Sequence, residues 1–270
     1  MYRNLVSHIA LQGLPVMLLV MAFLPFHQAV AQEPLEGVFI PRPGEFVSAE
    51  YPRVFDVVRK GGLTIEVWFL IKAVPGASGR WVLFGKSGNY WAEIEGNAEG
   101  WKVWVNVYCQ SPNGNRGMSR GYFDSKKLNQ WIHVALQFID EAKVQKSFSA
   151  VFLQGRPKFG AGHKDSQCKL IRSESPLLIG WRRSRDNSPQ ELWIDQVRIS
   201  RTLRYPSKLL PRPLPVDKDT LALWNFDEGP WANRYRDASG NRYTLFRNGI
   251  RAINGKEKLT TTWGKIKTGK

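Results

Sequence analysis

The 270-residue chain contains only two cysteines and four histidines. These residues do not have the spacing of a zinc site, so a zinc-stabilised module is excluded. The sequence also lacks the G-x-S-x-G elbow, the P-loop and the H-E-x-x-H pair. Their absence removes the serine hydrolases, nucleotide-binding proteins and metalloproteases that carry these motifs. The sequence therefore favours a protein without catalytic activity.

Long apolar runs are also absent once the first 31 residues are set aside. Within them, Arg3 precedes an apolar run over 14–26, and Ala29-Val30-Ala31 is an A-x-A cleavage sequence. This order is typical of a secretory signal peptide, because the run is shorter than the roughly 20 residues of a membrane span. We expect cleavage near Ala31 and a protein that is secreted, periplasmic or on the cell surface, not integral to the membrane. An uncleaved N-terminal anchor is the alternative.

The two cysteines, Cys109 and Cys168, both follow the predicted signal peptide. An even number of cysteines in an exported chain indicates one disulfide. It would close a loop of about 60 residues and stabilise the fold by roughly 4 kcal/mol in the chain-entropy description. Two free thiols in separate strands are the alternative.

Acidic residues are in the minority, since 39 Lys and Arg stand against 23 Asp and Glu, for a net charge of +16. A basic surface favours anionic partners such as an acidic polysaccharide or a cell envelope. A generally solvating surface is the alternative. Nucleic acid is disfavoured, because no nucleic-acid motif is present in this exported chain. The basic segment 251–270 is expected to form a strand or a tail.

Four segments alternate apolar and polar residues with the period of a half-buried β-strand, and each is bounded by turn-forming residues. They are GGLTIEVWFLI (61–71), NQWIHVALQF (129–138), SPLLIGW (175–181) and ELWIDQVRIS (191–200). Their spacing predicts an all-β protein, an antiparallel sandwich of two sheets.

Two of these segments, 61–71 and 129–138, together with LWIDQVRISRTLRY (192–205), resemble laminin-G-like domains of the concanavalin A-like group. The resemblance extends through LALWNFDEGP (221–230) and RDASGNRYTL (236–245). It covers 44–250, which leaves 32–43 as a lead-in. It implies a jelly-roll sandwich that binds carbohydrate or protein, in some members with one calcium ion.

Eleven tryptophans supply candidates for a ligand site. Trp68, Trp81 and Trp131 lie in strong strand patterns and are expected in the core. An exposed indole is a good platform for stacking a sugar. We selected Trp91, Trp101, Trp181 and Trp231 as candidates, because they lie near turns or on mixed faces, as Trp104 does.

A basic cluster follows one of these tryptophans. Arg182, Arg183 and Arg185 can each grip a sulfate, carboxylate or phosphate through paired hydrogen bonds. A solvated loop is the alternative for this cluster.

Three polar residues are candidates for a calcium site. Asp195 is predicted on the apolar strand face of Val197 and Ile199, where a carboxylate needs a partner. Asp237 and Asn241 lie in an Asp-x-Ser-Gly-Asn turn whose oxygens could line a cation site. An ordinary structural role, satisfied by backbone amides, is the alternative for each.

These features favour a secreted, non-catalytic recognition module for carbohydrate or an anionic surface polymer. A structural or adhesive module that contacts envelope proteins is one alternative. A polysaccharide-active enzyme is another, but Glu93 and Glu95 do not complete the carboxylate pattern of such enzymes.

Overall fold

A computed structural model describes residues 39, 41, 45–49, 52–56, 62–74, 79–97, 99–110, 113–114, 116–141, 146–162, 169–182, 192–204 and 212–248. Of 116–117, 119, 140–141, 146–148, 159–162 and 182 it describes the backbone alone. The chain divides into two compact units, 1–34 and 35–270, and every described residue belongs to the second. The predicted signal peptide, most of the lead-in and the basic segment 251–270 lie outside the described residues. No described helix is long and apolar enough to cross a membrane.

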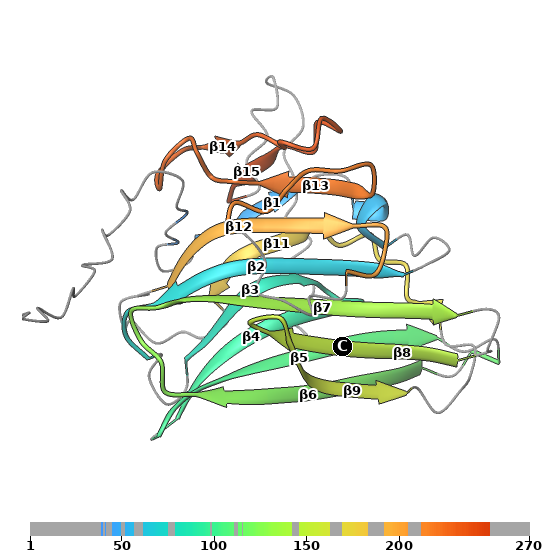
Figure 1. Ribbon diagram of the computed structural model, residues 1–270. Coiled ribbons are helices and arrows are strands. Elements are labelled where there is room, and N and C mark those ends of the chain that lie inside the picture. The colour runs from blue at the N-terminus through green and yellow to red at the C-terminus, as the bar shows by residue number, and fades with distance from the viewer. Residues whose placement is uncertain are drawn as a thin grey trace, which may run out of the picture. The chain divides into compact units, whose positions relative to one another are not determined.

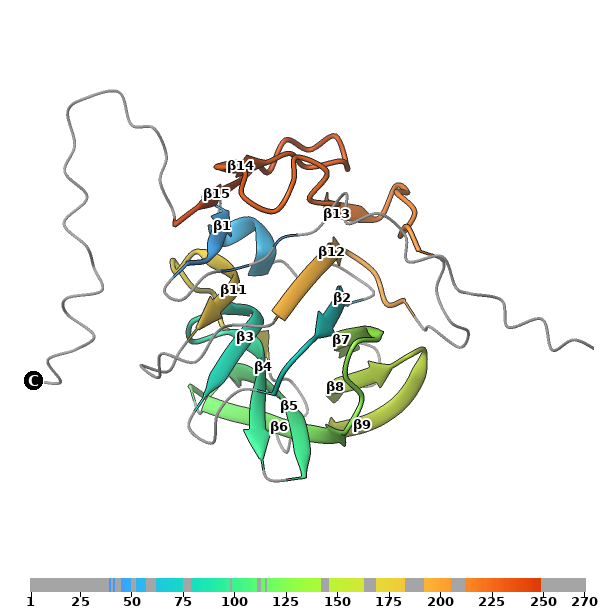
Figure 2. The same cartoon turned by 90° about the vertical axis from the view of Figure 1, so that its left-hand side faces the viewer.

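Two antiparallel sheets form the described part of the chain, and Figures 1 and 2 show them as two layers. The prediction of an all-β, antiparallel two-sheet sandwich is confirmed. The nine-stranded sheet runs in the order β10 (Lys169–Leu170), β5 (Gly100–Gln110), β4 (Tyr90–Asn97), β3 (Arg80–Lys86), β11 (Leu177–Arg182), β1 (Val47–Ala49), β15 (Leu245–Arg247) and β14 (Arg234–Tyr235), with β6 (Arg116–Ser125) also paired to β5. The six-stranded sheet runs in the order β13 (Thr220–Trp224), β12 (Leu192–Ser200), β2 (Leu63–Ile71), β7 (Trp131–Glu141), β8 (Lys146–Leu153) and β9 (Arg156–Gly162). A short 3-10 helix, η1, spans Pro52–Asp56.

The core lies between the two sheets and is built by period-two alternation. On β5, Trp101, Val103 and Val105 are buried in this core, and the residues between them point to the opposite face. Trp81 is also in the core, as predicted. β6 and β9, each at one edge of its sheet, lie close together and close the sandwich along that side.

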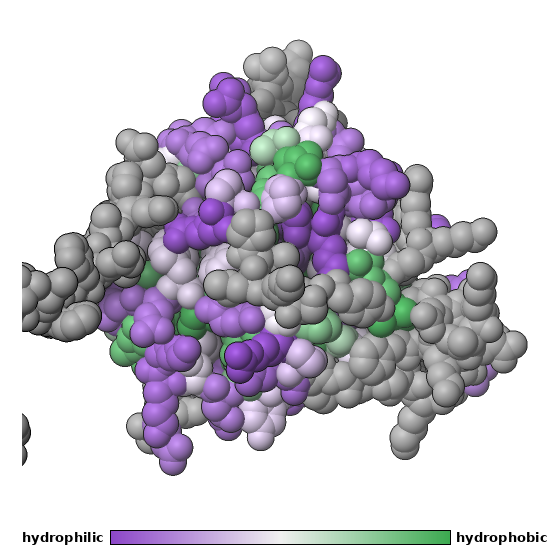
Figure 3. Space-filling view, viewed as in Figure 1, coloured by the Kyte–Doolittle hydropathy of each residue, from purple (hydrophilic) through white to green (hydrophobic). Residues whose placement is uncertain are grey.

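The outer face of the six-stranded sheet, which points away from the core, is covered as well. Trp68 is buried there in a small cluster with Leu214 and Leu223, and not in the main core. Trp131, also predicted in the core, packs partly buried against this cluster. The segments 201–204 and 212–216 therefore lie over this sheet, and hydrophobic residues form only small, separate groups on the side seen in Figure 3.

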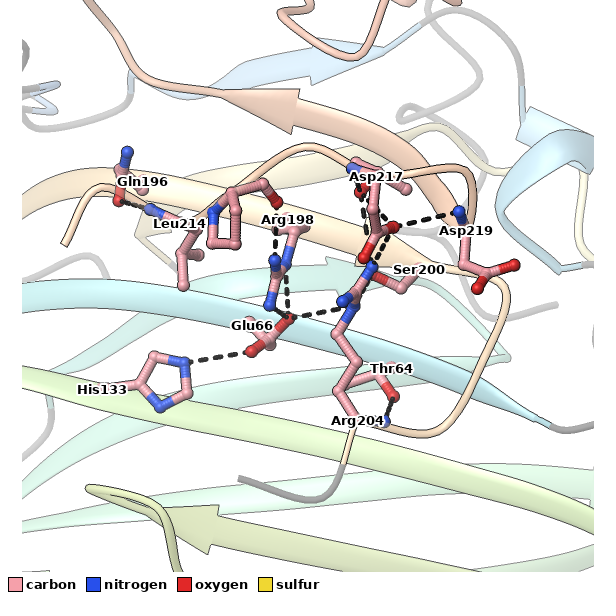
Figure 4. A network of polar contacts seen from close by, with 12 residues as sticks. Thr64, Glu66, His133, Gln196, Arg198, Ser200, Arg204, Leu214, Asp217 and Asp219 are labelled. Carbon is pink, nitrogen blue, oxygen red and sulfur yellow. Dashed lines mark hydrogen bonds and ion pairs between the residues drawn. The ribbon is translucent and has the colours of Figure 1, made fainter. Parts of the chain in front are cut away.

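A buried ion pair anchors this covering. Arg198 of β12 donates to the Glu66 carboxylate of β2, with Nε–Oε2 at 2.7 Å, and to the carbonyl of Pro215. His133 Nε2 lies 3.4 Å from the other Glu66 oxygen, as Figure 4 shows. His133 faces away from the core, as its strand pattern predicts. All three side chains are almost fully buried, so the charges of Glu66 and Arg198 depend on one another rather than on water.

Arg204 continues this network toward the surface. Its guanidinium donates to Ser200 and to Asp217, with Nη2–Oδ1 at 2.6 Å. The hydrogen bond from Arg204 lowers the pKa of Asp217 well below that of an ordinary carboxyl group. Because the folded state favours the charged carboxylate, its contribution to stability is full above the unfolded pKa and is lost as the pH falls.

We expect Asp217→Asn to lower the free energy of unfolding at neutral pH, because the substitution removes the ion pair with Arg204. The difference from the wild type should shrink below about pH 3.9, the ordinary aspartate pKa, because there the carboxylate of the unfolded wild type begins to bind a proton while the folded one stays charged. Urea unfolding at a series of pH values measures this. Asp219→Asn is the matched control, since Asp219 enters the network through its backbone N–H. An Asp217→Asn difference that is constant from pH 7 to about pH 2 would contradict the assignment.

The strand register bears on the predicted disulfide. Cys109 is buried on the core face of β5, directly opposite Leu170 of β10. Cys168 lies outside the described residues, but the chain enters β10 one residue later, at Lys169. Cys109 thus pairs with the strand that begins one residue after Cys168 in the sequence, and the disulfide stays a prediction.

The intact mass of the unreduced protein is expected to be lower than that of the reduced protein by two hydrogen atoms. Cys168→Ser should lower the free energy of unfolding by roughly 4 kcal/mol, the value for a closed loop of this size. Adding reductant should bring the wild type down to the same stability. Equal masses before and after reduction would show two free thiols instead.

Candidate functional site

The outer face of the nine-stranded sheet carries the candidate site, on strands β11, β3, β4, β5 and β6. Alternation along β5 turns Lys102, Trp104 and Asn106 away from the core residues Val103 and Val105. The pairing register between strands identifies which residues of the neighbouring strands point to the same outer face.

The register aligns the outward residues in a row across these strands. Glu93 of β4 pairs with Val82 of β3 on one side and with Trp104 of β5 on the other. Trp104 in turn pairs with Tyr122 of β6, and Trp181 of β11 pairs with Val82. Directly paired residues of antiparallel strands point to the same face. The row therefore places three aromatic side chains on one face of the sheet.

Trp104 and Tyr122 form the centre of this face. Their ring centroids are 4.6 Å apart and the rings are tilted by 52°. The Arg120 guanidinium lies 3.9 Å from the centre of the Trp104 ring. The Trp104 indole N–H donates to Glu95 Oε2, which fixes the rotation of the ring. Tyr122 is 49% exposed, so this pair offers apolar surface to the solvent.

Trp91 joins this face in the adjacent row, where it pairs with Gly85 and Asn106. A Cβ atom on Gly85 would lie 2.6 Å from the Cβ of Trp91. A side chain at position 85 would therefore displace the indole, which explains the glycine. We call Trp91, Trp104, Tyr122 and Trp181 the aromatic platform.

Charged side chains surround the aromatic platform in pairs. Arg80 donates to Glu93 and to Glu95, each at 3.1 Å. The Glu93 side chain is only 2% exposed, whereas Arg80 and Glu95 are 35% and 26% exposed. Lys102 Nζ lies 3.6 Å from Asp124 and 4.8 Å from the centre of the Tyr122 ring. Fixed donors and acceptors thus flank the aromatic surface.

A buried ion pair holds the β3–β4 hairpin that carries part of this site. Lys86 Nζ donates to Asp56 Oδ2 of η1 at 2.5 Å, and Asn89 donates to the other oxygen at 2.7 Å. Burial raises the pKa of Asp56 and lowers the pKa of Lys86, because each charge has lost its water. The pair ties the turn of the hairpin to η1, so strands β3 and β4 have a fixed base.

The structure brings together only some of the predicted ligand residues. Trp91 and Trp181 lie on the aromatic platform. The prediction of Trp101 as a ligand residue was wrong, because this side chain is fully buried. Its indole N–H donates to the carbonyl of Lys127. Its alternation with Val103 had already placed it on the core face. Trp231 is 49% exposed but lies in the connection between β13 and β14, at the opposite edge of the sheet.

The predicted basic cluster adds no described side chain to this site. Arg183 and Arg185 lie outside the described residues, and only the backbone of Arg182 is described. The residues that the sequence selection omitted are Trp104 and Tyr122. For Trp104 the signal was present, since it alternates with the core valines of β5. Tyr122 is identified only through its pairing with β5.

Asp195 occupies a different position from the predicted one. The register between β12 and β2 shifts between Ile194 and Gln196, so a bulge removes Asp195 from the apolar row of Val197. The placement on that row was therefore wrong. The Asp195 carboxylate accepts from Arg212 Nε at 2.6 Å.

Asp237 and Asn241 protect the edge of β13. Asp237 accepts from the backbone N–H groups of Leu223, Ser239 and Tyr243. Asn241 donates to the carbonyl of Leu221 at 2.9 Å. The turn thus satisfies backbone groups that an edge strand would leave unpaired. In the part of the chain that the structure describes, no three His, Cys, Asp or Glu side chains are grouped to hold a metal, and calcium binding stays a prediction.

No protein-family model and no curated protein matches the chain. Among solved structures, it is similar to a candidate carbohydrate-binding protein from Bacteroides ovatus, with a TM-score of 0.53 and 14% identity over 80% of this chain and 59% of that one. It is also similar to the binding domain of botulinum neurotoxin serotype D, with a TM-score of 0.45 and 11% identity over 62% of this chain and 39% of that one. The chain therefore spans less than two thirds of the length of either structure. The likeness to the Bacteroides ovatus protein shows that the two proteins share the sandwich fold.

Proposed function

We propose that this protein is an exported, non-catalytic recognition module that binds carbohydrate on the aromatic platform. The observation that carries the proposal is the Trp104–Tyr122 pair, partly exposed on the outer face of a sheet and flanked by Arg80, Glu95 and Lys102. Aromatic rings stack on the apolar face of a sugar, and fixed polar groups around them bind its hydroxyl groups.

The placement of these side chains on strands supports the proposal. A binding site built on strands holds its geometry better than one built on loops. Arg80 fixes Glu95, and Glu95 accepts the indole N–H of Trp104. The central ring is thus positioned before the ligand arrives, which lowers the entropy lost on binding.

The carboxylates of this face favour binding over catalysis. Glycoside hydrolysis needs two carboxyl groups on opposite sides of the scissile bond, one of which donates a proton. Glu93 and Glu95 project from the same strand face and share the guanidinium of Arg80, and Glu93 is almost fully buried. This arrangement suits a structural support for Trp104 better than an acid and a nucleophile.

The fold comparison is in accord with this proposal, since the Bacteroides ovatus structure is described as a candidate carbohydrate-binding protein. The resemblance to laminin-G-like domains and the predicted signal peptide agree with a module that acts outside the cytoplasm. Membership of that family and export are part of the proposal.

We expect Trp104→Ala to weaken glycan binding at least tenfold, which corresponds to about 1.4 kcal/mol, because the variant loses the stacking surface. A glycan array followed by isothermal titration of each hit measures the effect. Tyr122→Phe should bind nearly as well as the wild type, since it keeps the ring.

Trp231→Ala is the matched control, because Trp231 is an exposed tryptophan outside the aromatic platform. Thermal unfolding of each variant checks that the fold is retained. Equal loss of binding in the Trp104 and Trp231 variants, or no binding of the wild type to any glycan, would refute the proposal. The second result would favour a protein-contact module.

A further inference from the structure

The aromatic platform lies in a charge-balanced region, although the chain as a whole is strongly basic. Among the side chains that the structure describes, three cations and three anions surround it, so their formal charges cancel. They are Arg80, Lys102, Arg120, Glu93, Glu95 and Asp124. The described side chains of this surface therefore carry no net charge.

The cations beside the rings are already engaged. Arg80 forms two ion pairs, and Lys102 pairs with Asp124. Arg120 stacks on the Trp104 ring. A sulfate or carboxylate of a ligand would have to displace the carboxylates that pair with Arg80 and Lys102, and it would approach Glu95, whose charge repels it. An uncharged sugar can accept and donate hydrogen bonds without breaking any of the ion pairs.

The sequence shows where the excess charge lies. Residues 80–125 hold five basic and four acidic residues, a net charge of +1 out of +16. Residues 251–270 alone hold six basic residues and one acidic residue. Most of the excess charge thus lies outside residues 80–125, and part of it, Arg182, Arg183 and Arg185, directly follows Trp181 in the sequence.

The row of paired residues also indicates the shape of the ligand. From Trp181 on β11 it crosses β3 and β4 to Trp104 on β5 and Tyr122 on β6. At about 4.8 Å between neighbouring strands, four steps span about 19 Å. This length exceeds a single sugar ring, so only an extended chain could contact Trp181 and Tyr122 together.

We propose that the ligand is an uncharged polysaccharide, bound as an extended chain that runs across the strands from β11 to β6. This inference rests on the proposed function, because it names the class of carbohydrate that the aromatic platform takes.

Two sets of probes test the inference with purified protein. Soluble β-glucan, xyloglucan and galactomannan represent uncharged chains, and polygalacturonate and heparin represent acidic ones. Each is titrated at about 0.05 M and about 0.5 M NaCl, which changes the range of electrostatic interactions severalfold. A series of oligosaccharides, from the monosaccharide to the hexasaccharide of any chain that binds, measures the length of the site. The variants are Trp104→Ala, Trp181→Ala and the control Trp231→Ala.

We expect an uncharged chain to bind with an affinity that changes less than about twofold between the two salt concentrations, since no ion pair to the ligand is screened. Affinity should rise with oligosaccharide length. Trp104→Ala should weaken binding at least tenfold, Trp181→Ala should weaken only the longer oligosaccharides, and Trp231→Ala should have no effect.

The other outcomes separate this inference from the proposed function. If only acidic chains bind, if their binding weakens with salt and if Trp104→Ala abolishes it, the proposal of an uncharged ligand would be overturned. The proposed binding site would be retained. A monosaccharide that binds as tightly as the hexasaccharide would overturn the extended chain. The protein could instead bind acidic chains equally well with and without Trp104→Ala, and bind no uncharged chain. This result would overturn both proposals and assign binding to basic segments elsewhere.

Discussion

The ion pair between Glu66 and Arg198 keeps one face of the sandwich covered by the chain itself. It lies on the outer face of the six-stranded sheet and holds the carbonyl of Pro215 over that face. A buried charge without its partner costs several kcal/mol, so the covering segment and the pair stabilise each other. Around β2 this sheet is consequently enclosed on both sides, as the complete burial of that strand shows. The proposed ligand site accordingly lies on the outer face of the nine-stranded sheet.

Period-two alternation could be recognised in the sequence, and it predicts which side chains of a strand face the core as well as the fold. On β5 it assigns Trp101 to the core together with Val103, and it assigns Trp104 to the outside. The choice of Trp101 as a ligand residue used its closeness to a turn instead of its strand face. For a tryptophan within a strand, the face is the stronger criterion, because a one-residue step moves the side chain to the other side of the sheet.

Other parts of the site depend on pairings that no single segment reveals. Tyr122 comes beside Trp104 only because β6 pairs with β5 in one register, and Arg80 reaches two glutamates across the β3–β4 pairing. Bulges add to the difficulty. At Asp195 the bulge places one extra residue on β12 opposite β2, so the alternation of faces is offset from that point. The composition of the strand gives no sign of this bulge. The chain-wide pattern thus predicts the sandwich, while the long-range register decides the site.

Net charge is a poor guide to the ligand of such a protein, because charge acts locally when ions are paired at short range. The +16 of the chain suggests an acidic partner, yet Arg80 is held between two carboxylates and stabilises the orientation of Glu95, which in turn orients the Trp104 indole. These charges serve the positioning of an apolar ring rather than the attraction of an anion. A site of this kind gains affinity from a surface that is fixed in advance, since fewer side chains lose freedom when the ligand binds. The ion pairs that balance the charges of the described side chains on this surface also hold its central ring in place. Both effects suit an uncharged ligand.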